Sequence, residues 1–78
     1  LTIGEHTQEM ISCDTGFQSA QIAIIRNAIA VCEQEQDYVS REILDAIIVE
    51  EEEYLDWLET QQYQIEHIGI EKYIQAQL

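Results

Sequence analysis

Apolar side chains recur every seven residues along the first half of the chain, with polar residues between them. One row holds Met10, Phe17, Ile24 and Val31, and the row beside it holds Ile11, Gln18, Ile25 and Cys32. Residues seven apart lie on nearly the same face of an α-helix. The two rows therefore predict a helix from about Thr7 to Gln34 with a broad apolar face.

A polar segment, residues 33–37, interrupts this periodicity and predicts a turn. Asp37 is suited to the N-cap of the next helix, because its carboxylate can accept from the free N–H groups of the first turn. A second helix is expected over about residues 38–68, followed by Gly69, a residue type that commonly follows a helix end. Residues 70–77 have room for one short helix. The apolar rows of the second helix are Leu44, Glu51, Leu58, Ile65 and Ile47, Tyr54, Gln61, Ile68.

Two long helices joined by a turn of a few residues must fold back antiparallel. Their apolar stripes are wider than one partner helix requires, so a hairpin alone leaves part of each stripe uncovered. The predicted fold class is all-α. Residues 1–78 are expected to form half of a four-helix bundle, an antiparallel hairpin plus a short C-terminal helix, which needs another hairpin for stability.

Composition limits the classes of partner. The 78 residues include 3 basic and 16 acidic side chains, a formal net charge of -13. Nucleic acids and anionic membrane surfaces would repel such a chain, so neither is expected as a partner. No apolar run approaches the ~20 residues of a transmembrane helix. Cys13 and Cys32 lie too far apart on one predicted helix to form a disulfide, and free thiols without a leader segment favour the cytoplasm.

The candidate functional residues are Gln18, Glu51 and Tyr54, which are polar residues within the apolar rows. Gln18 and Glu51 are similarly distant from the turn, so they are expected at about the same height in the hairpin. A buried carboxylate at that height needs a partner. Two interpretations remain open. One is a structural hydrogen-bonded layer, and the other is a metal site of the kind that combines Glu on one helix with Glu-x-x-His on its neighbour.

Glu51 belongs to a run of four carboxylates at residues 50–53. One helix cannot direct all four to the same side, because successive residues differ by 100°. Glu51 is expected to face inward, and the others form either a solvated face or an acidic lining that gathers cations.

Several motifs in the chain are shared with a known family. They are DYVSR at residues 37–41, DWLET at 56–60 and YIQAQ at 73–77, together with the opening LTIGE at 1–5. These motifs resemble the C-terminal half of a bacterioferritin subunit, and the similarity covers all 78 residues. The resemblance implies a ferritin-like fold to which this chain supplies the third and fourth long helices and the short fifth helix.

The same resemblance implies a function. Bacterioferritins form 24-subunit shells that oxidise ferrous iron at a di-iron centre and store ferric mineral. They bind haem between two subunits through a methionine of the second helix. That helix is not in this chain and Met10 does not match its methionine, so haem is implied only through a missing N-terminal half or a partner subunit.

Matched by position, the family's glutamate on the third helix falls on Gln18. The glutamate of its Glu-x-x-His pair falls on Glu51, and the histidine falls on Tyr54. Since two of three ligands are replaced, Glu51 is the one intact metal ligand implied and Gln18 and Tyr54 are degenerate positions. The di-iron site is expected to be impaired, and this chain alone is not expected to be an enzyme.

Three further positions are implied by the resemblance to line openings of the shell. Asp56 matches an acidic residue at a pore between subunits. Lys72 and Gln75 match positions on the short helix that lines the four-fold channel, where Lys72 would add positive charge.

The sequence thus predicts a split or truncated component of a bacterioferritin-like iron-storage shell. Its expected partners are a complementary N-terminal half chain or intact ferritin subunits. Two alternatives remain open, both of them an acidic helical hairpin that homodimerises. The dimer would be either a minimal metal-binding bundle through two copies of Glu51 or a metal-free interaction module.

Overall fold

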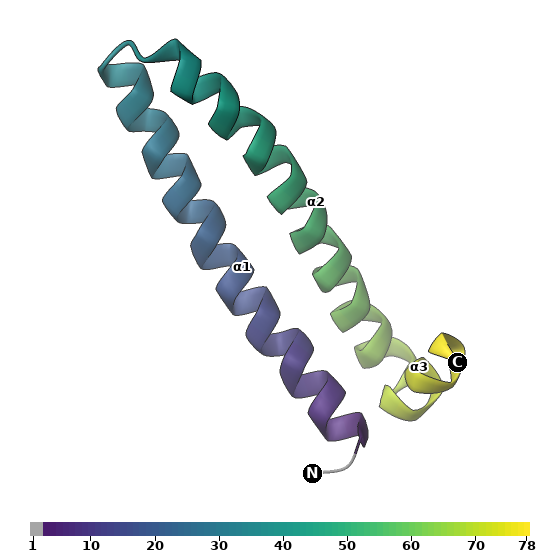
Figure 1. Cartoon of the computed structure of the whole chain (residues 1–78). Coiled ribbons are helices and arrows are strands. Elements are labelled where there is room, and N and C mark those ends of the chain that lie inside the picture. The colour runs from purple at the N-terminus through teal and green to yellow at the C-terminus, as the bar shows by residue number, and fades with distance from the viewer. Residues whose placement is uncertain (1–2) are drawn as a thin grey trace.

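The computed structural model describes residues 3–78, so Leu1 and Thr2 of the opening motif lie outside the described residues. Figure 1 shows two long helices, α1 (Ile3–Gln34) and α2 (Tyr38–Ile68), that run antiparallel, and a short α3 (Ile70–Gln77) beside their open end. The predicted all-α hairpin with a short third helix is confirmed. The first helix begins at Ile3, ahead of the predicted start near Thr7.

The turn between α1 and α2 is closed by local hydrogen bonds. Gln36 adopts a left-handed conformation with φ 55°, and the Asp37 N–H donates to the carbonyl of Cys32 at 2.8 Å. The Asp37 carboxylate accepts from the N–H of Ser40 at 3.1 Å, as expected of an N-cap. Hydrogen bonding by the side chain and by the backbone N–H of Ser40 holds the pKa of Asp37 below its ordinary value, because it stabilises the ionised carboxylate.

The short helix α3 folds back because Gly69 ends α2. Gly69 has φ 82°, a conformation that favours glycine, and its N–H donates to the carbonyl of Ile65 at 2.9 Å. Ile70 and Ile74 of α3 then pack against the core. A Cβ added to Gly4 would lie 3.2 Å from Cγ1 of Ile70, so a glycine at this position lets α3 approach the start of α1 closely.

The core between the helices is a thin apolar seam. Its buried apolar side chains are Ile11, Ile22, Leu58, Ile65 and Tyr73, of which Leu58 is only 1% exposed. Gln18 and Gln61 are buried among them. No helix in residues 3–78 is long and apolar enough to cross a membrane. Cys13 is exposed and Cys32 is half-buried, and both are free thiols.

A second apolar surface runs along the hairpin, and residues 3–78 leave it exposed. We call it the open face. On α1 it consists of Met10, Phe17, Ile24 and Val31, each more than half exposed, and on α2 of Ile47, Tyr54, Trp57 and Ile68, each at least 40% exposed. At 100° per residue, both sets fall on the same side of the antiparallel pair. This face follows a hairpin 50 Å long.

Candidate functional site

The centre of the hairpin holds a polar contact between the two long helices. Gln18 of α1 is only 5% exposed, and Glu51 of α2 is half-buried. The Gln18 Nε2 donates to the backbone carbonyl of Glu51 at 3.1 Å and also to the Glu51 carboxylate oxygen Oε2. The sequence rows predicted this pairing, because the two residues lie at similar distances from the turn.

Both acceptors of the Gln18 amide belong to Glu51. An amide presents two N–H hydrogens on one nitrogen, so a single Gln18 Nε2 can satisfy two acceptors. Contact with two acceptors also identifies the group that faces Glu51 as the amide nitrogen and not the amide oxygen. The Glu51 carboxylate is therefore held by a neutral donor within the protein.

Tyr54 takes no part in the hydrogen bonds of this contact. Its side chain is 45% exposed on the open face, where its ring stacks on Trp57 with centroids 6.1 Å apart and planes 9° from parallel. Tyr54 follows Glu51 by three residues, or 300°, so the two side chains point about 60° apart. Of the three predicted polar residues, the structure thus brings Gln18 and Glu51 together and directs Tyr54 toward the open face.

The other carboxylates of the acidic run spread around α2. Glu50 and Glu53 are exposed, whereas Glu52 is half-buried and accepts from Arg26 of α1 at 2.8 Å. This ion pair crosses the hairpin on the side opposite the open face. Both of its side chains are substantially exposed, so its contribution to stability is small.

A second buried polar pair was not predicted. The Tyr73 hydroxyl of α3 donates to the side-chain oxygen Oε1 of Gln61 at 2.5 Å, and both residues are buried. Gln61 carried the same signal as Gln18, a polar residue within an apolar row. Its partner could not be found from helical periodicity, because Tyr73 reaches it only after the chain reverses at Gly69.

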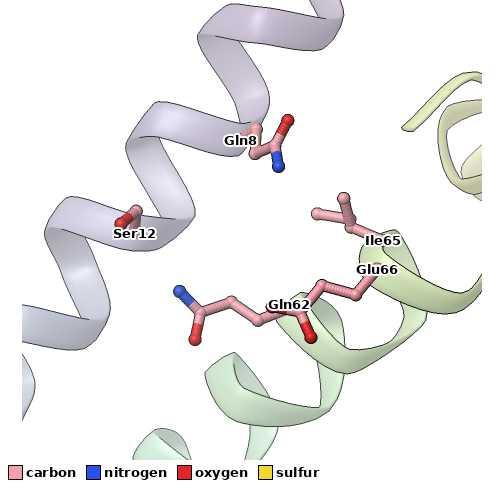
Figure 2. Close-up of a pocket in the computed structure, with 5 residues that line it drawn as sticks. All are labelled: Gln8, Ser12, Gln62, Ile65 and Glu66. Atoms are coloured by element: carbon pink, nitrogen blue, oxygen red, sulfur yellow. The ribbon is translucent and has the colours of Figure 1, made fainter. Parts of the chain in front are cut away.

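A small pocket of about 160 Å³ opens between the start of α1 and the end of α2. Figure 2 shows Gln8 and Ser12 on one wall, facing Gln62, Ile65 and Glu66 on the other. Apart from Ile65 the lining is polar, and Glu66 is its one ionisable group. The pocket lies on the same side as the Arg26–Glu52 pair, away from the open face.

Comparison with known proteins places this hairpin in a family. A model of the ferritin family, described as a ferritin-like domain, matches residues 2–68. The chain belongs to the ferritin family. It is 42% identical over 79 aligned positions to a bacterial ferritin of Synechocystis sp., an alignment that covers 100% of this chain and 51% of the relative.

Two other relatives also match nearly all of this chain with about half of their own length. A bacterial ferritin of Pseudomonas aeruginosa is 38% identical, with 96% of this chain and 49% of the relative covered. A bacterioferritin of Brucella melitensis is 32% identical, with 94% of this chain and 45% of the relative covered. This ferritin-family chain therefore spans about half the length of the curated relatives it matches.

The donor set at the centre does not fit the metal site that the resemblance implied. In the part of the chain that the structure describes, no three His, Cys, Asp or Glu side chains lie close enough together to hold a metal ion. Glu51 supplies one carboxylate, and the group beside it is an N–H donor, which cannot ligate a cation. Tyr54 points toward the open face. These residues of one chain do not compose a metal centre.

The residues expected to line shell openings are all exposed. Asp56 lies on α2, and Lys72 and Gln75 lie on α3. Gln75 also lines a shallow hollow where α3 meets the start of α1. Their exposure leaves each side chain accessible to a neighbouring molecule, and their channel roles stay predictions.

Proposed function

We propose that this chain is a structural component of a bacterioferritin-like iron-storage shell, with ferrous iron as the substrate of the assembled particle. The observation that carries the proposal is the family match over residues 2–68 in a chain about half as long as its relatives. The open face supports it, since an apolar surface of this length requires a cover. We propose further that this chain acts as a split or truncated subunit, because another polypeptide would then cover the open face.

The partner we propose is a complementary half chain that supplies the first two helices of the bundle. The unmatched half of each relative has about the length needed for a second hairpin. Charge favours this occupant over a second copy, because pairing two identical chains would double the net charge from -13 to -26 (2 × -13). Intact ferritin subunits would then complete the shell.

Within that shell, this chain is proposed to contribute surface and channel residues rather than ferroxidase chemistry. Its acidic balance attracts cations toward the shell, and Asp56, Lys72 and Gln75 are the proposed channel residues. Haem, if the particle holds it, is bound by the missing half or by a partner subunit. The cytoplasmic location expected from the sequence stays a prediction.

The proposal is tested by native mass spectrometry of the protein purified from its source, followed by denaturing identification of every chain. We expect a particle of several hundred kilodaltons that contains this chain and a companion with the missing helices. Ferrous iron added to that particle should be retained as ferric mineral. A species of about 18 kDa (2 × 9.1 kDa) containing only this chain would refute the shell.

The second candidate function is a metal-free helical interaction module. The hydrogen bond from Gln18 to Glu51 favours it, because this contact needs no ion. Deletion of residues 70–78 separates the two candidates. A shell component should lose its assembly size when the channel helix is removed, whereas a free-standing module should keep it.

A further inference from the structure

We propose that Gln18 and Glu51 form a metal-independent clasp that sets the register of α1 against α2. The clasp is the pair of hydrogen bonds from Gln18 Nε2 to the backbone carbonyl and the carboxylate of Glu51. It goes beyond the proposed function and does not depend on it, because it rests on this contact alone.

The chemistry of the contact explains why a glutamine occupies position 18. Two oxygen acceptors of Glu51 face this side chain, so the group opposite them must be a hydrogen-bond donor or a cation. A glutamate here would bring two carboxylates together in a partly desolvated seam, and only a proton or a cation could relieve their repulsion. The Gln18 amide N–H groups occupy the position that a cation would otherwise take.

The geometry of the contact explains how it specifies register. The turn sets the approximate alignment of the two helices, and buried apolar side chains such as Ile22 and Leu58 still tolerate small displacements along the helix axis. Gln18 does not, because a shift of one turn would remove both acceptors from an amide that is 5% exposed. A buried amide without partners is strongly disfavoured, so one alignment of the helices is selected.

The experiment is thermal unfolding, followed by circular dichroism, of the protein in the assembly in which it is purified. Each sample is measured in EDTA and in excess Zn²⁺, a cation without redox chemistry. The test variant is Gln18→Glu, and the matched control is Gln8→Glu, which adds the same charge at an exposed position of α1 on the side away from the open face. Glu51→Gln serves as a second variant that keeps an oxygen acceptor for Gln18.

We expect Gln18→Glu to lower the midpoint in EDTA by more than about 5 °C, and Zn²⁺ to restore a large part of the loss. Gln8→Glu and Glu51→Gln should each stay within a few degrees of the unmodified protein in EDTA. Failure of Gln18→Glu to fold in EDTA, with folding in Zn²⁺, would equally support the clasp.

Two results would overturn the proposal. One is a Zn²⁺-dependent rise in the midpoint of the unmodified protein that Glu51→Gln abolishes, since Glu51 would then be a metal ligand. The other is a Gln18→Glu variant as stable in EDTA as the unmodified protein. A rise with Zn²⁺ that persists in Glu51→Gln arises at other sites of the assembly and leaves the clasp metal-independent.

Discussion

The seam between α1 and α2 and the open face of the same hairpin are built from similar residues in different surroundings. Ile11 and Ile22 of α1 are buried against α2, whereas Phe17 and Ile24 of the same helix are more than 60% exposed. The seam also encloses the Gln18–Glu51 contact, and the open face carries the stacked Tyr54 and Trp57 rings. Apolar character alone therefore does not decide burial here. The described residues present an apolar surface that they do not themselves cover.

The largest effect is expected when negatively charged side chains are introduced on the open face. The double variant Phe17→Glu, Ile24→Glu should abolish association while leaving the seam residues unchanged, because two buried carboxylates without partners strongly disfavour the bound state. Native mass spectrometry of the co-purified chains measures the loss. The matched control is Val49→Glu, an exposed apolar position on the side of α2 that points away from α1. Association of the double variant at the unmodified size would show that the open face is not covered.

The seam is tested by truncating its most buried side chain. Leu58→Ala should destabilise the assembled protein by about 2–5 kcal/mol, because it removes apolar contacts and leaves a cavity. Urea unfolding measures this change through the denaturation midpoint. Val39→Ala, at a position 74% exposed, is the control and should change the free energy of unfolding by less than about 0.5 kcal/mol. If the two substitutions lowered the free energy of unfolding equally, the seam would not be the region that stabilises the protein.

The end of the seam is tested at Tyr73 of α3, whose hydroxyl donates to Gln61 of α2. Tyr73→Phe should cost about 1–3 kcal/mol, because it leaves the buried Gln61 oxygen without its donor. Relative to the unmodified protein, amide hydrogen exchange in the Tyr73→Phe variant should accelerate more in α3 than in the middle of α2. Tyr63→Phe removes a hydroxyl from a ring that is 60% exposed and should have little effect. Unchanged α3 protection in Tyr73→Phe would show that the apolar contacts of Ile70 and Ile74 hold this helix alone.

The smallest expected effect lies at the turn, which belongs to neither surface. Asp37 has a folded-state pKa below its ordinary value of 3.8, because Ser40 hydrogen-bonds the ionised carboxylate. Its charge therefore contributes stability above the ordinary pKa, and that contribution is lost as pH falls through the lowered pKa. Asp37→Asn keeps a capping oxygen but does not titrate. The small difference in thermal midpoint between the two proteins should shrink in acid, and a difference that grows in acid would contradict this assignment.

Much of the hairpin was predictable because its signals are local. The seven-residue rows predicted both long helices, Asp37 marked the start of the second, and Gly69 marked its end. The Gln18–Glu51 contact was also predictable, since equal distance from a tight turn brings two residues to the same height. The direction of Tyr54 was not, because a difference of 60° around a helix decides between the seam and the open face.

Local patterns in the amino-acid sequence were sufficient to predict the two helices, the turn between them, the excess of apolar surface and the polar residues within the apolar rows. These follow from helical periodicity and from capping chemistry, which depend on residues a few positions apart. Two features depend on how the helices pack: which apolar row became the seam, and the contact of Gln61 with Tyr73 of the returning α3. Those outcomes depend on how the helices rotate against one another and on the path of the chain after Gly69. No local pattern encodes them, because the contacting residues come from separate helices.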